Sequence, residues 1–143
     1  LYSGRIGNIL IAYLIMEAKI IMRSDFVLFS MIFLHILDDF CLQGIMASMK
    51  QKSWWQKDPV GSQSKYKNDY IAALFAHSFS WAFMIMIPVM ICGQWEWPIL
   101  IANMLTHAVI DNAKANKFQI NLIQDQTYHL IQIIVTWLIF VVL

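Results

Sequence analysis

Three histidine–aspartate pairs in the sequence repeat the same spacing of four residues. The pairs are His35–Asp39, His107–Asp111 and Asp125–His129. Residues four apart share one face of a helix, so each pair presents an imidazole and a carboxylate together. These groups are ligands for zinc, iron and manganese, and they also exchange protons. A fourth histidine, His77, has no acid beside it in sequence, and Cys41 and Cys92 are too few and too far apart for a zinc knuckle or a disulfide framework.

The composition indicates which elements position these side chains. The chain has 143 residues, of which 59% are hydrophobic and 13% are charged. Soluble domains carry about 25% charged residues, and a membrane-spanning helix needs about 20 mostly apolar ones. We therefore predict an all-α protein, a polytopic bundle of four transmembrane helices. The expected spans are residues 26–47, 70–92, 99–113 and 122–143.

The N-terminal segment is less regular. Residues 6–22 are apolar in part but include Glu17 and Lys19, which fits an interfacial helix or a short fifth span. The interfacial helix is favoured because residues 23–25 leave little room for a turn. We therefore divide the chain into an N-terminal segment, 1–25, and a transmembrane domain, 26–143. The sequence begins with Leu1 rather than Met, so it does not decide where the native chain begins, and no cleavable signal peptide is evident.

The lysines predict the orientation of the bundle. They gather in the connections 50–69 and 114–121, whereas the connection between the second and third spans carries only Glu96. Lysine and arginine collect on the cytoplasmic side of membranes. Each histidine then lies about eight to ten residues from the cytoplasmic end of its span, about 12–15 Å deep at about 1.5 Å per residue. Because ionisable groups in the bilayer cost about 2.5–3.5 kcal/mol each, we expect them to face one another in a shared polar centre.

Three interpretations of that centre stay open: a structural hydrogen-bond network, a metal site, or a path for protons. The outer halves of the spans offer few polar residues, which weakens the third. The metal site is favoured, with a divalent transition metal, zinc above others, as the cofactor. The proposed ligands are His35, His107 and His129, completed by His77 or Asp111. Asp39 and Asp125 are candidates for a general base or for orienting the imidazoles, and Gln43, Gln126 and Lys114 for holding a substrate oxyanion or phosphate.

The stretch from His35 to Gln43, His-Ile-Leu-Asp-Asp-Phe-Cys-Leu-Gln, resembles the opening signature of a family of small bacterial and phage membrane proteins, domain of unknown function 3307. Its pattern, His-x-x-x-Asp-Phe-x-x-Gln, leaves Asp38 as an extra acid. The segments 107–114 and 125–129 resemble that family's downstream motifs, so the resemblance covers about residues 26–135. It implies a small polytopic fold and no established activity. The histidine–acid pairs are also loosely similar to bacterial membrane-bound metal-dependent hydrolases and, at the site alone, to seven-span zinc hydrolases that include ceramidases.

These observations lead to two hypotheses from different classes. The first is a membrane-embedded metal-dependent protein, a hydrolase of a lipid or another amphiphile, at the cytoplasmic face of the bacterial inner membrane. The second is a non-enzymatic subunit of a phage or envelope complex whose histidines and aspartates only fasten the helices. Whether the protein is an enzyme stays open here. The expected partners are the lipid bilayer, a lipid substrate and further copies or subunits. No nucleic-acid partner is expected, and the net charge of +1 does not bear on that question.

Overall fold

The computed structural model describes residues 13–14, 23–57 and 65–142, and within these ranges it contains helices and no strands. The all-α prediction is confirmed. The elements are a helix over residues 23–36, a π-helical turn η1 (Leu37–Leu42), two short helices α2 (Met46–Met49) and α3 (Lys52–Lys57), and three long helices α4 (Asp69–Ile91), α5 (Trp97–Ala115) and α6 (Leu122–Val142).

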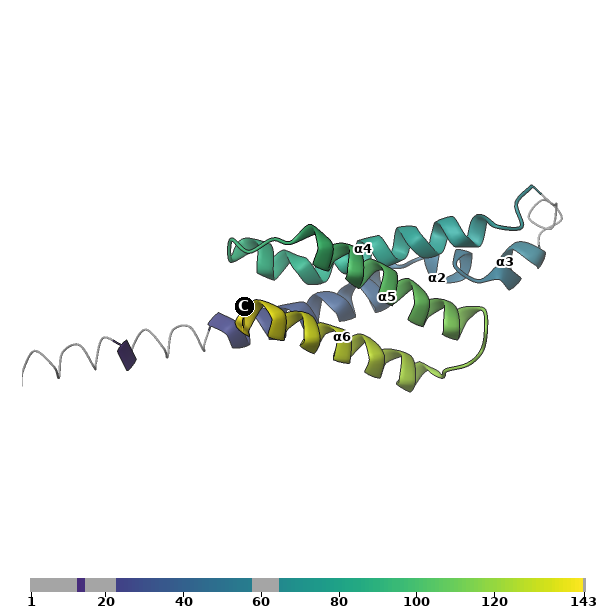
Figure 1. The fold of residues 1–143 in the computed structure, drawn as a ribbon. Coiled ribbons are helices and arrows are strands. Elements are labelled where there is room, and N and C mark those ends of the chain that lie inside the picture. The colour runs from purple at the N-terminus through teal and green to yellow at the C-terminus, as the bar shows by residue number, and fades with distance from the viewer. Residues whose placement is uncertain (1–12, 15–22, 58–64, 143) are drawn as a thin grey trace, which may run out of the picture.

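Four helical segments lie side by side and alternate in direction (Figure 1). They are residues 23–42, α4, α5 and α6. The two lysine-bearing connections meet at one end, where the Lys52 backbone N–H donates to Asn116 Oδ1 over 2.6 Å and Asn116 Nδ2 donates to the Lys50 carbonyl over 3.0 Å. The prediction that both connections lie at the same end of the bundle is therefore confirmed.

The first helical segment ends differently from the prediction of one span over residues 26–47. The α-helix gives way to η1, in which the Gln43 backbone N–H donates to the Asp38 carbonyl, five residues back, over 3.1 Å. Gly44 then takes a φ of +48°, a conformation that glycine adopts without steric cost, and the segment ends. A π turn advances by a smaller angle per residue, so Asp38 and Asp39 both reach the bundle interior.

The other boundaries agree closely with the sequence. Helix α4 begins and ends one residue before the predicted 70–92, and α6 begins at Leu122 as expected. Helix α5 is longer than the predicted 99–113 by two residues at each end, because Pro98 can occupy the first turn of a helix without losing a hydrogen bond. The N-terminal segment 6–22 lies outside the described residues except for 13–14.

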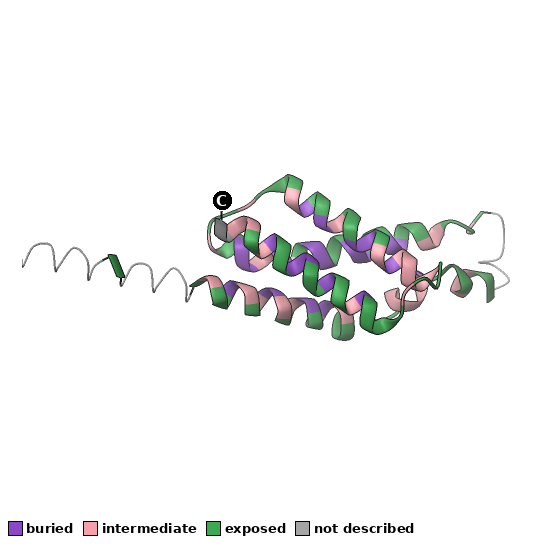
Figure 2. Ribbon diagram, turned by 60° about the horizontal axis from the view of Figure 1, so that its bottom comes forward, coloured by how far each residue is buried: buried purple, intermediate pink, exposed green. Residues whose placement is uncertain are grey.

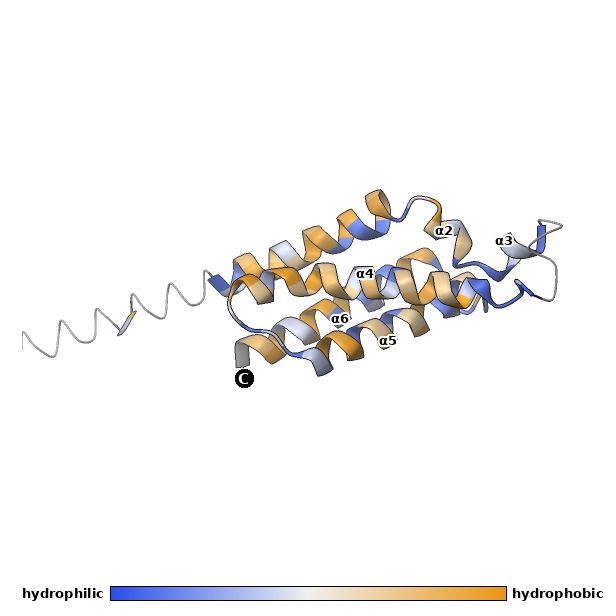
Figure 3. Ribbon diagram, turned by 90° about the horizontal axis from the view of Figure 1, so that it is seen from above, coloured by the Kyte–Doolittle hydropathy of each residue, from blue (hydrophilic) through white to orange (hydrophobic). Residues whose placement is uncertain are grey.

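The bundle buries polar groups as readily as apolar ones and exposes apolar side chains (Figures 2 and 3). Met31, Trp81, Ile85 and Ile133 form a fully buried apolar core toward the α4–α5 turn. The outer face of residues 23–42 carries a stripe of aromatic side chains that are each more than 60% exposed: Phe26, Phe29, Phe33 and Phe40. Exposed apolar surface of this extent is typical of a surface that contacts lipid or another protein.

Among the described residues, α4 is the one helix whose length and hydropathy suffice for a membrane span. The buried core helix of a soluble protein can have the same two properties. Helices α5 and α6 bring His107, Asp111, Asp125 and His129 into the bundle, and these polar residues lower their hydropathy. Helix α4 alone therefore does not establish a four-span protein.

Candidate metal centre

The four imidazoles come together in the bundle interior, each from a different helical segment. Ring centroids lie 4.2 Å apart for His107 and His129, 5.0 Å for His77 and His107, and 5.7 Å for His35 and His129. None of the four residues is more than 3% exposed. The predicted convergence of the histidines is confirmed.

His35 is held by hydrogen bonds at both ring nitrogens. The Trp81 indole N–H donates to His35 Nδ1 over 2.7 Å, so the His35 proton is on Nε2 and donates to Gln126 Oε1 over 3.1 Å. Gln126 Nε2 in turn donates to Asp39 Oδ2 over 3.0 Å. His35 was proposed from sequence as a metal ligand, but in this arrangement it has no free lone pair to offer. It instead orients Gln126 and, through it, Asp39.

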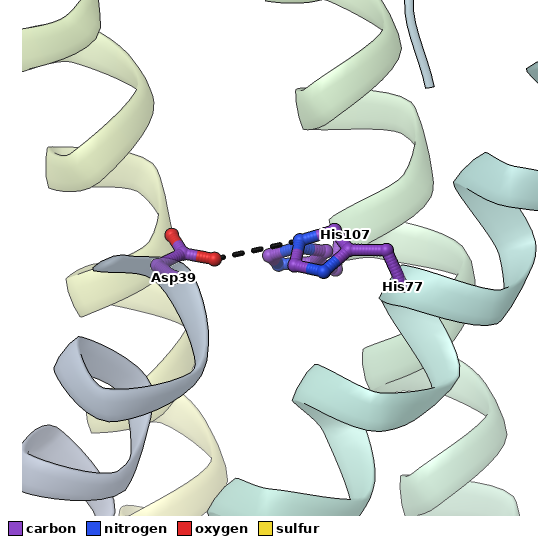
Figure 4. A group of neighbouring side chains, drawn as sticks. All are labelled: Asp39, His77 and His107. Atoms are coloured by element: carbon purple, nitrogen blue, oxygen red, sulfur yellow. Dashed lines mark hydrogen bonds and ion pairs between the residues drawn. The ribbon is translucent and has the colours of Figure 1, made fainter. Parts of the chain in front are cut away.

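The nitrogen His77 Nε2 lies at the middle of a compact group of potential ligands. It is 3.1 Å from His107 Nε2, 3.3 Å from Asp111 Oδ2 and 3.4 Å from Asp39 Oδ1. Figure 4 shows the Asp39 carboxylate pointing across the bundle at the two imidazoles. Gln43 Nε2 donates to Asp39 Oδ1 over 2.9 Å and lies 3.2 Å from His77 Nε2, which closes this group on the side of η1.

These spacings fit the edges of a metal coordination shell. With metal–ligand bonds of about 2.0–2.2 Å, neighbouring ligand atoms of a tetrahedral site lie about 3.3–3.6 Å apart. The distances around His77 Nε2 run from 3.1 to 3.4 Å, and His107 Nε2 lies 3.7 Å from Asp111 Oδ2. The buried histidines and aspartates are therefore placed so that they could hold a metal ion, as the sequence predicted.

A second group surrounds His129 Nε2, which lies 3.4 Å from Asp111 Oδ1 and 3.4 Å from Asp125 Oδ1. Neither contact has hydrogen-bond geometry. Within the described part of the chain, both His129 Nε2 and Asp125 Oδ1 are buried without a hydrogen-bond partner. Buried polar atoms are nearly always paired, so these two atoms are available to a ligand.

Two lysines enter the same cluster: Lys50, which directly follows α2, and Lys114, in the last turn of α5. Lys50 Nζ donates to Asp111 Oδ2 and Lys114 Nζ to Asp125 Oδ2, each over 2.5 Å. The cluster contains four carboxylates whose side chains are at most 5% exposed, those of Asp38, Asp39, Asp111 and Asp125. With neutral imidazoles, four carboxylates and two ammonium groups leave two negative charges, which one divalent cation would balance.

Asp38 supports His77 from behind. Its Oδ1 accepts a hydrogen bond from Ser80 over 2.8 Å, and its Oδ2 lies 3.6 Å from His77 Nδ1. A carboxylate behind a ligating imidazole fixes the orientation of the ring at many metal sites.

Four residues of the cluster have no role predicted from the sequence: Asp38, Ser80, Trp81 and Lys50. Ser80 and Trp81 follow His77 by three and four residues, so helical spacing could have linked them to that histidine. Lys50 lies in a connection, and no local pattern marks it.

A cavity of about 320 Å³ adjoins the cluster at its lysine-bearing end. Its polar lining includes Asp39, Gln43, Lys50, Asp111, Lys114 and Gln126, and its apolar lining includes the exposed side chains of Phe40, Phe118 and Leu122. The structure thus brings the three residues proposed to hold a substrate, Gln43, Gln126 and Lys114, to one cavity. Asp125 is not part of its lining.

Comparison with known proteins adds no relative. No protein-family model matches the chain, no curated protein matches it, and no solved structure matches it. The resemblance to the domain of unknown function 3307 family therefore stays a prediction, and the function is argued from the site itself.

Proposed function

We propose that residues 23–42, α4, α5 and α6 each span a membrane. The three named helices have 23, 19 and 21 residues, and at about 1.5 Å per residue they match a hydrocarbon core of about 30 Å. Apolar side chains cover their outward faces, and the ionisable groups meet inside, the arrangement that a lipid environment requires. The lysine-bearing end faces the cytoplasm of a bacterial cell in this proposal.

Within this bundle we propose a metal-dependent hydrolase. The observation that carries the proposal is the approach of His77 Nε2, His107 Nε2 and Asp111 Oδ2 to within 3.7 Å of one another in the buried interior of the bundle. These three atoms hold a divalent cation, and Asp39 faces it from the cavity. Asp38 fixes the His77 ring.

The residues around the cavity have different roles in the proposed hydrolysis. A divalent cation polarises both water and the ester or phosphoryl group under attack. Asp39 accepts the proton that water loses as its oxygen bonds to the carbonyl carbon or phosphorus. The ester bond to the leaving oxygen breaks, and that oxygen takes up the proton that Asp39 accepted. Gln43 and Gln126, which both donate to Asp39, hold its carboxylate in place.

The lining of the cavity favours an amphiphilic substrate with a negatively charged headgroup. Lys50 and Lys114 lie on its polar side, where a lysine near a membrane surface attracts an anionic lipid by about 1 kcal/mol. Phe40, Phe118 and Leu122 extend the opening toward the apolar outer surface, where acyl chains can remain in lipid.

A second candidate function is structural. Two lysine–aspartate ion pairs and the chain from Trp81 through His35 and Gln126 to Asp39 connect all four helical segments without any metal. This observation favours a purely structural role for the polar centre, as the alternative of a non-enzymatic subunit of a phage or envelope complex would require.

Metal analysis of detergent-purified protein separates the two functions. The hydrolase proposal predicts bound divalent metal that is lost in His107→Ala but retained in Asn103→Ala, a matched control because Asn103 is a buried polar residue one turn earlier on α5. It also predicts metal-dependent cleavage in a panel of fluorogenic lipid carboxyl and phosphate esters, abolished by a chelator. Metal-free wild-type protein that loses stability in His107→Ala would establish the structural function instead.

A further inference from the structure

Asp111 lies between two groups of potential ligands, and each of its oxygens faces a different group. Its Oδ2 is 3.3 Å from His77 Nε2 and 3.7 Å from His107 Nε2. Its Oδ1 is 3.4 Å from His129 Nε2. The carboxylate therefore separates a position near His77 from a position near His129.

The group at His129 has the properties of a ligand shell in its own right. His129 Nε2 lies 3.4 Å from Asp125 Oδ1, and neither atom has a hydrogen-bond partner within the described residues. The 3.4 Å separations from Asp111 Oδ1 and Asp125 Oδ1 fall within the range of about 3.3–3.6 Å that tetrahedral ligands of one metal would show. His107, Asp111 and His129 also offer ligand atoms that lie within 4.8 Å of one another.

Each lysine bonds to one carboxylate oxygen of its aspartate and leaves the other oxygen without that contact. Lys50 bonds to Asp111 Oδ2 and Lys114 to Asp125 Oδ2, while Asp111 Oδ1 and Asp125 Oδ1 both point at His129 Nε2. A structural network would bring a donor to Asp125 Oδ1. This oxygen and His129 Nε2 are both buried, and within the described residues neither of them makes a hydrogen bond.

We propose that the cluster binds two divalent cations and that the Asp111 carboxylate bridges them. This inference rests on the proposed metal-dependent function and extends it. One cation lies among His77, His107, Asp39 and Asp111 Oδ2. The other lies among His129, Asp125 Oδ1 and Asp111 Oδ1. Bridged metal pairs are about 3.5–4 Å apart, a separation that the two oxygens of one carboxylate can hold.

The charge of the cluster is consistent with a second cation that comes with an anion. One dication neutralises the two surplus negative charges, and a second leaves two positive charges. The adjoining cavity, with its polar lining and its opening to the apolar surface, has room for an anionic headgroup such as a phosphate.

Metal stoichiometry tests the proposal directly. The purified full chain is dialysed against Mn²⁺ or Zn²⁺, and bound metal is measured per chain. We expect about two equivalents in wild type and about one in His129→Ala, in Asp125→Asn and in His77→Ala. Thr136→Val is the matched control for α6, because Thr136 is buried two turns beyond His129 and lies outside the cluster; it should retain about two.

Electron paramagnetic resonance of the Mn²⁺-loaded protein gives a second readout. Wild type should show a spin-coupled pair, and Asp125→Asn should show isolated Mn²⁺. Asp125→Asn preserves side-chain shape, so it keeps the test valid if His129→Ala does not fold.

The measured stoichiometry distinguishes failure of the second-cation inference from failure of the proposed hydrolase. One equivalent in wild type would overturn the second cation while leaving the proposed hydrolase. Two equivalents of metal in folded Asp125→Asn would overturn the proposed second site among His129, Asp125 and Asp111. No bound metal would overturn both the inference and the hydrolase.

Discussion

The indole N–H of Trp81 donates to Nδ1 of His35 over 2.7 Å, and this contact determines where the histidine proton lies. Because Nδ1 accepts, Nε2 must donate to Gln126, and the Gln126 amide must turn its NH₂ group toward Asp39. One residue in the apolar core thus sets the direction of the hydrogen bonds that run from His35 through Gln126 to Asp39. The same indole stacks on His107, with ring centroids 4.2 Å apart.

Trp81→Phe should therefore destabilise the protein while leaving metal binding intact. The phenyl ring can keep the stacking on His107 but offers no donor, so His35 Nδ1 is left buried and unpaired, at a cost of about 1–3 kcal/mol. Unfolding in mixed micelles measures the loss of stability, and metal analysis measures the bound metal per chain. Trp97→Phe, at an exposed position, is the control and should change stability by less than about 0.5 kcal/mol. Equal losses in the two variants would contradict the role assigned to the indole.

Lys50→Met should destabilise the metal-free protein by about 3–5 kcal/mol, because it leaves a buried carboxylate on Asp111 without its ion pair. A divalent cation bound at Asp111 supplies the missing charge, so metal should restore part of that stability. Chemical unfolding with and without metal measures both effects. Lys52→Met removes an exposed lysine two residues away and should have little effect in either condition. A metal effect of the same size in both variants would contradict the idea that Lys50 compensates Asp111.

Removing metal should lower the midpoint of thermal unfolding. A cation present at about 1,000 times its Kd stabilises the folded state by about 4 kcal/mol, and a chelator abolishes that contribution. The difference between metal-loaded and chelated protein should shrink in His77→Ala, which keeps only the position at His129, and persist in full in Asn103→Ala. Scanning fluorimetry follows the intrinsic tryptophan fluorescence during unfolding. It is carried out on the two variants, each with metal and with chelator. An equal shift in His77→Ala would show that the metal binds elsewhere.

The proposed topology predicts opposite accessibility for two connections. In a background of Cys41→Ser and Cys92→Ala, a thiol at Gln94→Cys should react with a membrane-impermeant reagent in intact spheroplasts. A thiol at Lys117→Cys should react only after permeabilisation. Both positions are exposed, so burial does not limit labelling. The reverse pattern would invert the orientation, and labelling of both thiols in intact spheroplasts would contradict the membrane-spanning arrangement.

Local spacing determined the parts of the site that lie on one helix. The four-residue separation of His107 and Asp111 places them on one face, and their side chains lie 3.7 Å apart in the structure. Apolar composition likewise determined the helical fold, and most helix boundaries agree within two residues with those expected from sequence. The first segment is the exception, because a π turn depends on backbone hydrogen bonds that no hydrophobic period reveals.

The partners of each group depended on how the helices pack. His35 has the same local pattern as His107, yet Trp81, 46 residues away, occupies its lone pair. Lys50 reaches Asp111 across a separation of 61 residues. The order of residues was enough to predict an all-helical chain with imidazoles and carboxylates on shared faces, since helical periodicity acts over a few residues. Packing of the helices sets which nitrogen is free, which oxygen a lysine occupies and which ligand atoms converge, because these follow from the rotation and offset of one helix against another.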